Sequence, residues 1–237
     1  MNILLVGYGK MGKAIEKIAL GSGHVISAAI DTVEEREAVN KSIPIDVAIE
    51  FSQPEAAIEN LKFCFDRNIP VVCGTTGWLE HKQEIVDYCK SKNGAFFYAS
   101  NFSLGVNLFF RLNEYLAKLM NGRQEYSLSI DETHHTQKKD APSGTAITLA
   151  EGIIATNPQF KQWAYPENFA KQAIVINSFR EDPAPGMHVV KYQSDVDDIE
   201  IKHTAHSREG FALGAVLVAE WLKGKKGVFT MDDFLKL

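Results

Sequence analysis

The sequence predicts an α/β protein in which a parallel sheet covered by helices is followed by an α+β domain on a mixed sheet. Three observations support this fold class. In the first hundred residues, short apolar runs alternate with helical patterns of ten to fifteen residues, which is typical of parallel sheets. A glycine-rich turn joins the first run to the first helix. Beyond residue 124, several strand-like runs follow one another, which indicates a second sheet.

In the first domain, each predicted strand is a short apolar run that ends in a turn or a polar residue. The predicted strands are Ile3–Val6, His24–Ile30, Asp46–Phe51, Pro70–Cys73 and Ala95–Ala99. The predicted helices are Lys10–Leu20, Pro54–Asn68 and Leu79–Lys92. Pro54 suits a first helical turn, because a residue at that position needs no N–H partner.

The second domain begins near Ser103, where the strand–helix alternation stops. It opens with a predicted helix, Val106–Met120, whose apolar stripe consists of Phe109, Leu112, Leu116 and Leu119. The predicted strands are Gln124–Thr133, Ala173–Arg180, Met187–Gln193 and Asp198–Ala205, and the predicted helices are Thr145–Ile154 and Phe211–Leu222. A last strand is predicted at Phe229–Met231, and we expect segment 208–237 to pack back on the first domain.

Composition limits the classes of function. The 237 residues suffice for one large or two small domains, and 25 lysines and arginines against 30 aspartates and glutamates give a net charge of −5. This charge argues against nonspecific nucleic-acid binding. No apolar run reaches the ~18 residues of a membrane span, and the N-terminus lacks a signal-peptide pattern. Three cysteines without a Cys-x-x-Cys pair, Cys64, Cys73 and Cys89, predict reduced, buried thiols in a cytoplasmic protein.

The glycine-rich turn has the pattern of a dinucleotide-binding fingerprint. Gly7-Tyr8-Gly9-Lys10-Met11-Gly12 follows the first strand and opens a helix, and Asp31 ends the next strand nineteen residues later. In such a Rossmann-type sheet, Gly7 permits the turn, Gly9 admits the pyrophosphate and Gly12 lets helix and strand pack closely. Asp31 would accept hydrogen bonds from ribose. The alternative is a glycine turn of another α/β protein.

Two further loops are expected at the same edge of the sheet. Gly74-Thr75-Thr76-Gly77 follows the fourth strand, and Ala99-Ser100-Asn101-Phe102 follows the fifth. Ligands of open parallel sheets bind beyond the carboxyl ends of the strands. Both loops are therefore candidate contacts of a nicotinamide or ribose, although a plain turn at Gly74–Gly77 is also compatible with the sequence.

The densest polar stretch lies in the second domain, between Glu132 and Ala146. Ser143 is a plausible N-cap of the following helix, and the amides of Gly144 and Thr145 would bind a carboxylate or phosphate. His134, His135 and Lys138 precede it closely. A cationic or proton-donating cluster beside an anion-binding helix end suits an acidic small molecule that must be protonated. A solvated loop is the alternative interpretation.

A metal site is not expected. His134 and His135 are adjacent and so lack helical i, i+4 spacing, and the sequence contains no His-Glu-x-x-His. His203 and His206 could supply ligands, but they lie in a predicted strand or turn.

These motifs together resemble the dihydrodipicolinate reductase family. The resemblance rests on the glycine fingerprint, Phe51-Ser52-Gln53-Pro54-Glu55, Gly74–Gly77, Asn101–Asn107, the His134–Thr145 stretch and the final Phe229–Asp233. It implies reduction of 4-hydroxy-tetrahydrodipicolinate, a dicarboxylate, by NADH or NADPH with loss of water, in diaminopimelate and lysine synthesis. It also implies a dinucleotide-binding domain at 1–103, a substrate-binding and oligomerisation domain at 104–207, and a homotetramer or a dimer.

By position, the resemblance implies His134 and Lys138 as catalytic proton-transfer residues. It implies that His135, Ser143, Gly144 and Thr145 contact the substrate. The implied cofactor contacts are Gly7, Tyr8, Gly9, Lys10, Met11, Gly12, Asp31, Gly74, Thr75, Thr76, Ala99, Ser100, Asn101 and Phe102. Thr32 stands where the family often has an arginine, which bears on the choice of cofactor.

Two other functions remain open at this point. Another NAD(P)-dependent amino-acid dehydrogenase would share the first domain but would not need His134, His135 and Lys138 beside Ser143. A non-catalytic dinucleotide sensor would keep the fingerprint and lose the proton donors.

Overall fold

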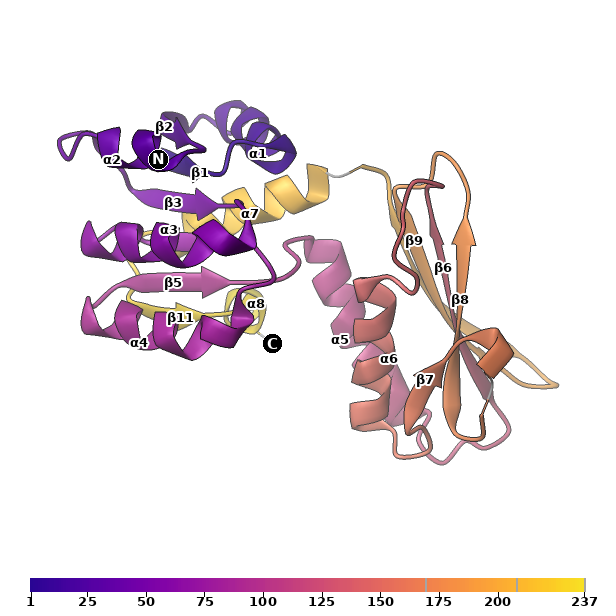
Figure 1. Ribbon diagram of the computed structural model, residues 1–237. Helices are drawn as coiled ribbons and strands as arrows, with labels where there is room; N and C mark the ends of the chain where they lie inside the picture. The colour runs from indigo at the N-terminus through magenta and orange to yellow at the C-terminus, as the bar shows by residue number, and fades with distance from the viewer. Residues whose placement is uncertain (169, 208, 237) are drawn as a thin grey trace. The chain divides into compact units, whose positions relative to one another are not determined.

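The chain folds into two compact units in the computed structural model, which describes residues 1–168, 170–207 and 209–236 (Figure 1). Unit 1 consists of Met1–Leu104 and Glu209–Leu237, and unit 2 consists of Gly105–Arg208. Arg208 and Leu237, the two ends of the segment expected to pack back, lie outside the described residues. Each unit has a core of its own.

Unit 1 contains a six-stranded sheet in which every neighbouring pair is parallel. The order along the sheet is β11-β5-β4-β3-β1-β2. The strands are β1 (Asn2–Val6), β2 (Val25–Ile30), β3 (Val47–Glu50), β4 (Val71–Cys73), β5 (Ala95–Tyr98) and β11 (Gly227–Phe229). The first half of the predicted fold class is thereby confirmed.

Helices cover both faces of this sheet because successive side chains of each strand point to opposite sides. Ile3 and Leu5 enter one core with α1 (Lys10–Gly21) and α7 (Glu209–Leu222), whereas Leu4 and Val6 enter the other with α3 (Pro54–Asp66) and α4 (Lys82–Ser91) (Figure 1). Further elements are a short helix α2 (Val33–Ala38), a 3₁₀ turn η1 (Leu79–His81) and α8 (Met231–Leu235). Cys64, Cys73 and Cys89 are buried free thiols, as predicted.

The strand order places a ligand crevice at β1. This strand lies between β2 and β3, so the connections that follow it run to opposite sides of the sheet. Ligands of open α/β sheets bind beyond the carboxyl ends of the strands at such a switch point. The glycine turn after β1 is therefore where a cofactor is expected.

Unit 2 contains a mixed five-stranded sheet of order β10-β9-β6-β8-β7, with α5 (Leu104–Leu119) and α6 (Gly144–Thr156) along one face (Figure 1). Its strands are β6 (Ser127–His134), β7 (Gln162–Ala164), β8 (Ala173–Arg180), β9 (Gly186–Gln193) and β10 (Asp198–Ala205). Leu128 and Ile130 of β6 pack under the helices with Leu149 and Ile153 of α6. The predicted mixed sheet is confirmed.

Three sequence-based expectations differ from the structure. The predicted strand Phe229–Met231 is wrong in its second half, because Thr230 caps α8 and that helix starts at Met231. The predicted stripe of the long helix is right at Phe109 and Leu116, which belong to or pack against the core, but wrong at Leu112 and Leu119, which are about half exposed. The short elements α2, β7 and η2 (Pro166–Asn168) were not expected. No helix among the described residues has the length and apolar character needed to span a bilayer.

Candidate active site

The glycine turn of unit 1 has the backbone that the fingerprint requires. Gly7 adopts φ +90°, and a Cβ on it would lie 2.1 Å from the carbonyl oxygen of Phe51. A Cβ on Gly12 would lie 2.3 Å from the carbonyl oxygen of Gly7. The first and third glycines are thus required by close packing. Gly9, by contrast, has nothing within 4 Å of its Cβ position, so its backbone is open to a ligand.

A cavity of about 210 Å³ lies beside this turn and has Gly7, Gly9 and Asp31 in its wall. One oxygen of Asp31 accepts a hydrogen bond of 2.9 Å from the backbone N–H of Tyr8, which ties the end of β2 to the glycine turn. Thr32, the N-cap of α2, makes a reciprocal capping box with Glu35. This arrangement fixes the direction in which α2 leaves the cavity wall.

Arg36 also lines this cavity, because α2 folds back from Asp31. Its guanidinium Nη1 donates to Asn60 Oδ1 on α3 at 3.0 Å, and Asn60 Nδ2 donates to Ser52 Oγ at 3.2 Å. The cavity therefore contains one carboxylate and one held cation. The sequence alone did not show whether the segment after Asp31 would bring Arg36 to this position.

The loops after β3 and β4 are held by a buried carboxylate. Glu50 is fully buried and accepts hydrogen bonds from the Ser52 hydroxyl and from Cys73 Sγ, the latter at 3.0 Å. Thr75 is also buried, and its hydroxyl accepts from Ser52 N–H at 2.8 Å. Thr76, by contrast, is exposed. Of this predicted pair, Thr75 therefore holds neighbouring loops together while Thr76 is accessible.

The loop after β5 combines buried and exposed predicted residues. Phe102 is buried, and its ring centroid lies 5.5 Å from that of Phe51. Ala99 is largely buried, whereas Ser100 is exposed. Asn101 Oδ1 accepts from Ser103 N–H at 2.9 Å, which shapes the entry into α5.

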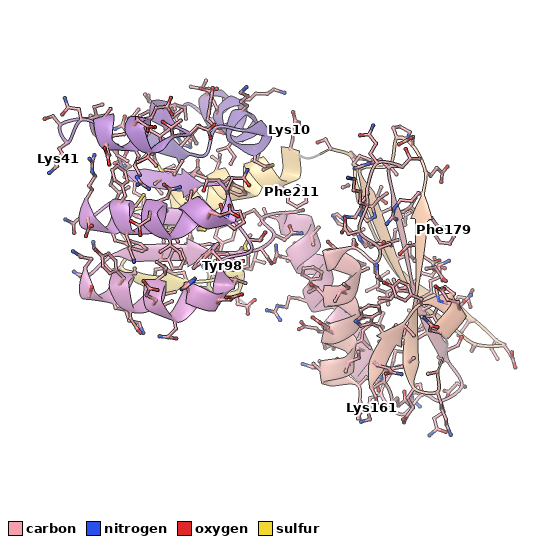
Figure 2. All side chains as sticks on the ribbon, viewed as in Figure 1. Lys10, Lys41, Tyr98, Lys161, Phe179 and Phe211 are labelled. Atoms are coloured by element: carbon pink, nitrogen blue, oxygen red, sulfur yellow. The ribbon has the colours of Figure 1, made fainter. Side chains whose placement is uncertain are left out.

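Taken together, the residues present in unit 1 fit a dinucleotide. The open backbone at Gly9, the unpartnered first-turn amides of α1 and the carboxylate of Asp31 suit the pyrophosphate and a ribose. Lys10 begins α1, is exposed, and is labelled in Figure 2. Tyr8 contributes its N–H to Asp31, while its phenol donates to Glu16. Met11 is half-buried against the core of the sheet.

In unit 2, strand register gathers the polar residues around Glu132. Glu132 and His134 lie two residues apart on β6 and so face the same side, which is the side that α5 and α6 cover further along the strand. Glu132 pairs with His188 on β9, and His134 pairs with Arg180 on β8. Phe179, next to Arg180 and labelled in Figure 2, lies half exposed on the other face of the sheet.

The Glu132 carboxylate is fully buried and lies among three potential cations. The distances are 3.6 Å from Oε2 to His134 Nδ1, 3.7 Å from Oε2 to His188 Nε2, and 3.6 Å from Oε1 to Arg180 Nη1. Ser143 N–H donates to Oε2 at 3.0 Å. Burial would raise the pKa of Glu132, but the interactions with His188 and Ser143 outweigh it and lower the pKa to about 2. The carboxylate is therefore charged.

His134 is neutral at neutral pH. Burial lowers its pKa, and the positive neighbours Lys138 and Arg180 lower it further, so that it reaches about 4 although Glu132 acts in the opposite direction. Its ring is 8% exposed, and the absence of a Cβ on Gly186 leaves room for Nε2, since that Cβ would lie 3.2 Å from it. At neutral pH the imidazole can therefore form hydrogen bonds, but it is poorly suited to act as a cationic acid.

Lys138 lies on the loop after β6 and is held in place by two contacts. Its Nζ forms an ion pair with Asp140, at 2.7 and 2.9 Å from the two carboxylate oxygens. Arg180 donates to the carbonyls of Lys138 and Asp140 at 3.2 and 2.7 Å. The lysine ammonium is thus carried by a loop that is anchored to β8.

The N-terminus of α6 is built as an anion site would be. Ser143 is the N-cap, and its hydroxyl accepts from Ala146 N–H at 3.2 Å. Gly144 is exposed and Thr145 is half-buried, and first-turn amides have no partner within their own helix. His135 lies elsewhere, in the wall of a cavity of about 350 Å³ that also includes Asp182. Of the predicted substrate contacts, Ser143 is the one bonded directly to the cluster around Glu132.

The same cluster is the place in the described part of the chain where a metal ion would find several ligands. One ligand atom each from Glu132, His134 and His188 lie within 4.8 Å of one another. However, Ser143 N–H already donates to Glu132 Oε2, and the Arg180 guanidinium lies beside Oε1. The Glu132 carboxylate therefore already has a hydrogen-bond donor in Ser143 and a counter-ion in Arg180.

Sequence reasoning missed Glu132, His188 and Arg180 as site residues, and it left open whether Arg36 would reach the cofactor cavity. Glu132 had one usable signal, since it stands two positions before His134 in a predicted strand and so shares its face. No local pattern pointed to His188 or Arg180, because strand register alone brings them to Glu132.

Comparison with known protein families finds two adjacent matches that cover nearly the whole chain. Residues 1–102 match the family model described as dihydrodipicolinate reductase, N-terminus, and residues 105–235 match the model for its C-terminus. A curated 4-hydroxy-tetrahydrodipicolinate reductase from Christiangramia forsetii is 52% identical over 99% of this chain and 98% of its own length. One from Methanocaldococcus jannaschii is 35% identical over 94% of this chain and 81% of its own length.

Solved structures with the same fold include a dipicolinate-bound dihydrodipicolinate reductase from Paenisporosarcina sp. TG-14. It has a TM-score of 0.78 and 21% sequence identity, with 97% of each chain covered. An amine dehydrogenase from Mycobacterium smegmatis has a TM-score of 0.63 at 10% identity, covering 98% of this chain and 95% of its own. At these identities, the structural matches establish the fold alone.

Proposed function

The chain belongs to the dihydrodipicolinate reductase family and is an NAD(P)H-dependent oxidoreductase that reduces 4-hydroxy-tetrahydrodipicolinate in diaminopimelate and lysine biosynthesis; from this premise we propose roles for its residues. Lys138 donates the proton that completes the reduction, and neutral His134 orients the reacting ring. The observation that carries this assignment is the lowered pKa of His134, about 4, beside an ion-paired Lys138.

The chemistry has three parts. Water leaves the hydroxylated ring and creates a double bond. The dinucleotide, when bound, supplies hydride to one carbon of that double bond. A proton from the Lys138 ammonium goes to the other carbon, and the resulting amine is reprotonated by solvent. The anion-binding end of α6, with Ser143, Gly144 and Thr145, holds one substrate carboxylate, and His135 contributes a further contact.

The cofactor is bound by unit 1, in the same proposal. The amides of Gly9, Lys10, Met11 and Gly12 meet the pyrophosphate, with Gly7 and Tyr8 shaping the turn and Asp31 accepting from the ribose. The loops at Gly74–Thr76 and Ala99–Phe102 form the nicotinamide end. We propose that both NADH and NADPH serve as cofactors, with kcat/KM for NADH at least equal to that for NADPH.

The proposal also covers the roles of the two units, the oligomeric state and the cellular location of the enzyme. Unit 1 is the dinucleotide-binding domain, and unit 2 binds the substrate and mediates association. The enzyme is a homo-oligomer, a tetramer by its family resemblance, and a measured mass of two chains would instead indicate a dimer. It acts in the cytoplasm, an environment suited to its three free cysteines.

The role of Lys138 is tested by kinetics. The cyclic substrate is generated in situ by the preceding synthase, and loss of nicotinamide absorbance at 340 nm gives the rate. Lys138→Ala is expected to lower kcat by ~10²–10⁴-fold, the usual contribution of a general acid, with cofactor KM nearly unchanged. A variant that kept near-normal kcat would rule out the proton-donor role.

The pH dependence separates the two candidate donors. If imidazolium at His134 supplied the proton, kcat would rise as pH falls from 7 towards about 4, because the protonated fraction grows over that range. We expect no such rise in the wild-type enzyme between pH 8 and 6. His134→Gln, which retains hydrogen bonding, is expected to lose less activity than Lys138→Ala.

A further inference from the structure

Three functional groups of unit 2 lie around one buried carboxylate, that of Glu132, and the proposed function does not use this carboxylate directly. Ser143 N–H donates to Glu132 Oε2 at 3.0 Å, and His134 Nδ1 faces the same oxygen at 3.6 Å. Arg180, at 3.6 Å from Oε1, carries the loop of Lys138 through its hydrogen bond to the Lys138 carbonyl. The N-terminus of α6, the imidazole of His134 and the loop of Lys138 are therefore all positioned around Glu132, the last of them through Arg180.

His188 is a second buried residue that contacts this cluster. It lies opposite Glu132 in the β6–β9 register, and its Nε2 is 3.0 Å from Ser143 Oγ. Ser143 Oγ also accepts from Ala146 N–H, so the hydroxyl is hydrogen-bonded on one side to the helix and on the other to the imidazole. His188 thereby fixes the rotamer of the residue that caps α6.

Several buried polar atoms of the cluster have no hydrogen-bond partner among the described residues. They are Glu132 Oε1, His134 Nδ1 and His188 Nδ1. Polar groups left buried without a partner destabilise a fold, and a purely structural core would avoid them by using apolar side chains. In apo structures, catalytic hydrogen bonds are often long and tighten when substrate binds. The 3.6 Å separation of His134 Nδ1 and Glu132 Oε2 fits that description.

We propose that Glu132 and His188 are positioning residues of the reduction. Glu132 holds His134 from its Nδ1 side and Ser143 from its backbone, and His188 holds the Ser143 hydroxyl. The proton-transfer residues and the carboxylate-binding helix end are thereby fixed relative to each other. This inference rests on the proposed roles of His134, Lys138 and the α6 terminus.

The test for His188 uses a pair of substitutions. His188→Leu removes the partner of Ser143, whereas His188→Gln keeps a side-chain amide close to the position of Nε2. We expect His188→Leu to raise the KM for the cyclic substrate about tenfold or more, because misplacing a binding group by about 1 Å has costs of that order. The KM for the dinucleotide should stay within about twofold, and His188→Gln should restore most of the loss.

The test for Glu132 uses a neighbouring carboxylate as its control. Glu132→Gln keeps the shape and removes the charge, and we expect kcat to fall by about 10²-fold. Asp131→Asn neutralises the adjacent residue of β6, which faces the other side of the sheet and pairs with Lys191 at 3.1 Å. This control variant should have a kcat close to that of the wild-type enzyme.

The outcomes distinguish this inference from the proposed function. If Lys138→Ala lowers kcat while both His188 variants and Glu132→Gln change only the melting temperature, the positioning role is overturned and the proposed function stands. If Lys138→Ala has no effect, the proposed function itself fails. Should Glu132→Gln not fold, the His188 pair decides. Loss of wild-type activity on chelation, with recovery on adding Zn²⁺, would also overturn the positioning role, because the cluster would then be a metal site.

Discussion

At the scale of single residues, unit 2 places an open helix end beside a closed polar cluster. Ser143 is buried and fully engaged by Glu132, His188 and Ala146, whereas Gly144 is exposed and Thr145 half-buried. The first two residues of α6 are thus accessible while the cap behind them is fixed. A preorganised end of this kind binds a carboxylate without first having to order itself.

Thr145 gives the sharpest test of this helix end. Thr145→Val keeps the shape and removes a hydroxyl that we expect to donate to a substrate carboxylate. A hydrogen bond to a charged group contributes roughly 1.5–3 kcal/mol, so the KM for the cyclic substrate should rise by about tenfold or more. Steady-state kinetics and a thermal melt check this together. A lowered melting temperature with unchanged KM would mean that Thr145 serves only the helix.

At the scale of elements, the end of β2 and helix α2 form the wall of the cavity in which we expect the two cofactors to be distinguished. We expect Asp31 to favour the 2′-hydroxyl of NADH and to repel a 2′-phosphate. Arg36 lines the same cavity and is held by Asn60, so one cation is placed to oppose that repulsion. Thr32, which directly follows Asp31, caps α2 with its side chain and brings no charge to the cavity.

We therefore expect dual use of the cofactors, with kcat/KM for NADH at least equal to that for NADPH. Arg36→Ala should lower kcat/KM for NADPH several-fold and leave kcat/KM for NADH nearly unchanged. Lys10, exposed at the start of α1, is a second cation near the glycine turn, and Lys10→Ala tests whether it serves a 2′-phosphate. Both cofactors are compared at one fixed ionic strength, since surface charges are screened by salt. A preference of more than about tenfold for NADPH, roughly 1.4 kcal/mol, would mean that a cation outweighs Asp31.

Helix α7 closely approaches the loop after β5 at Gly214. A Cβ there would lie 1.7 Å from the carbonyl oxygen of Phe102, and backbone atoms cannot move aside easily. Gly214→Ala should therefore lower the free energy of unfolding by about 1–3 kcal/mol. Gly210→Ala in the same helix is the matched control, because its Cβ would meet only Ser103 Oγ at 3.8 Å. Equal melting temperatures for the two variants would contradict the clash.

The elements that the sequence predicted well are those with strong local patterns. The apolar runs of β1 and β3–β5 and the glycine turn needed no distant partner to be recognised. Helix α2 was missed because it buries none of its residues and so has no apolar stripe. The strand predicted at Phe229–Met231 is right at Phe229 and wrong beyond it, because Thr230 and Asp233 form a capping box that starts α8.

The candidate site was predictable only in part for a related reason. The segments Gly7–Gly12 and Ser143–Thr145 can be recognised from local sequence patterns, the first by its glycine turn and the second by its helix cap. The partnership of Glu132 with His188 depends on which residue of β9 lies opposite β6, and a shift of one residue would have placed them on opposite faces. No spacing along the chain encodes that register. Which residues of the predicted sites contact ligands stays a prediction.

At the scale of the whole molecule, the chain leaves unit 1 once and returns to complete it. The returning segment supplies α7, α8 and the edge strand β11. Ala215, Val216, Ala219 and Leu222 of α7 are almost fully buried in the same core as β1 and β3. The core of unit 2, in contrast, is formed within one continuous stretch, from Phe109 to Ile201. The core of unit 1 therefore needs two segments that are far apart in the sequence, whereas the core of unit 2 needs one continuous segment.

This asymmetry predicts how fragments of the chain behave. A fragment 105–208 contains every residue of its own core and should unfold cooperatively by circular dichroism. A fragment 1–104 keeps α1 but lacks α7, so it exposes the part of one sheet face that α7 covers. Each large apolar side chain left unburied costs about 1.5–3 kcal/mol, so this fragment should show no cooperative transition. Adding a separate 209–237 peptide should restore the transition, because the missing helix and edge strand are then supplied in trans. Cooperative unfolding of 1–104 alone, at the temperature found for the whole chain, would mean that α7 only covers a sheet that is already stable.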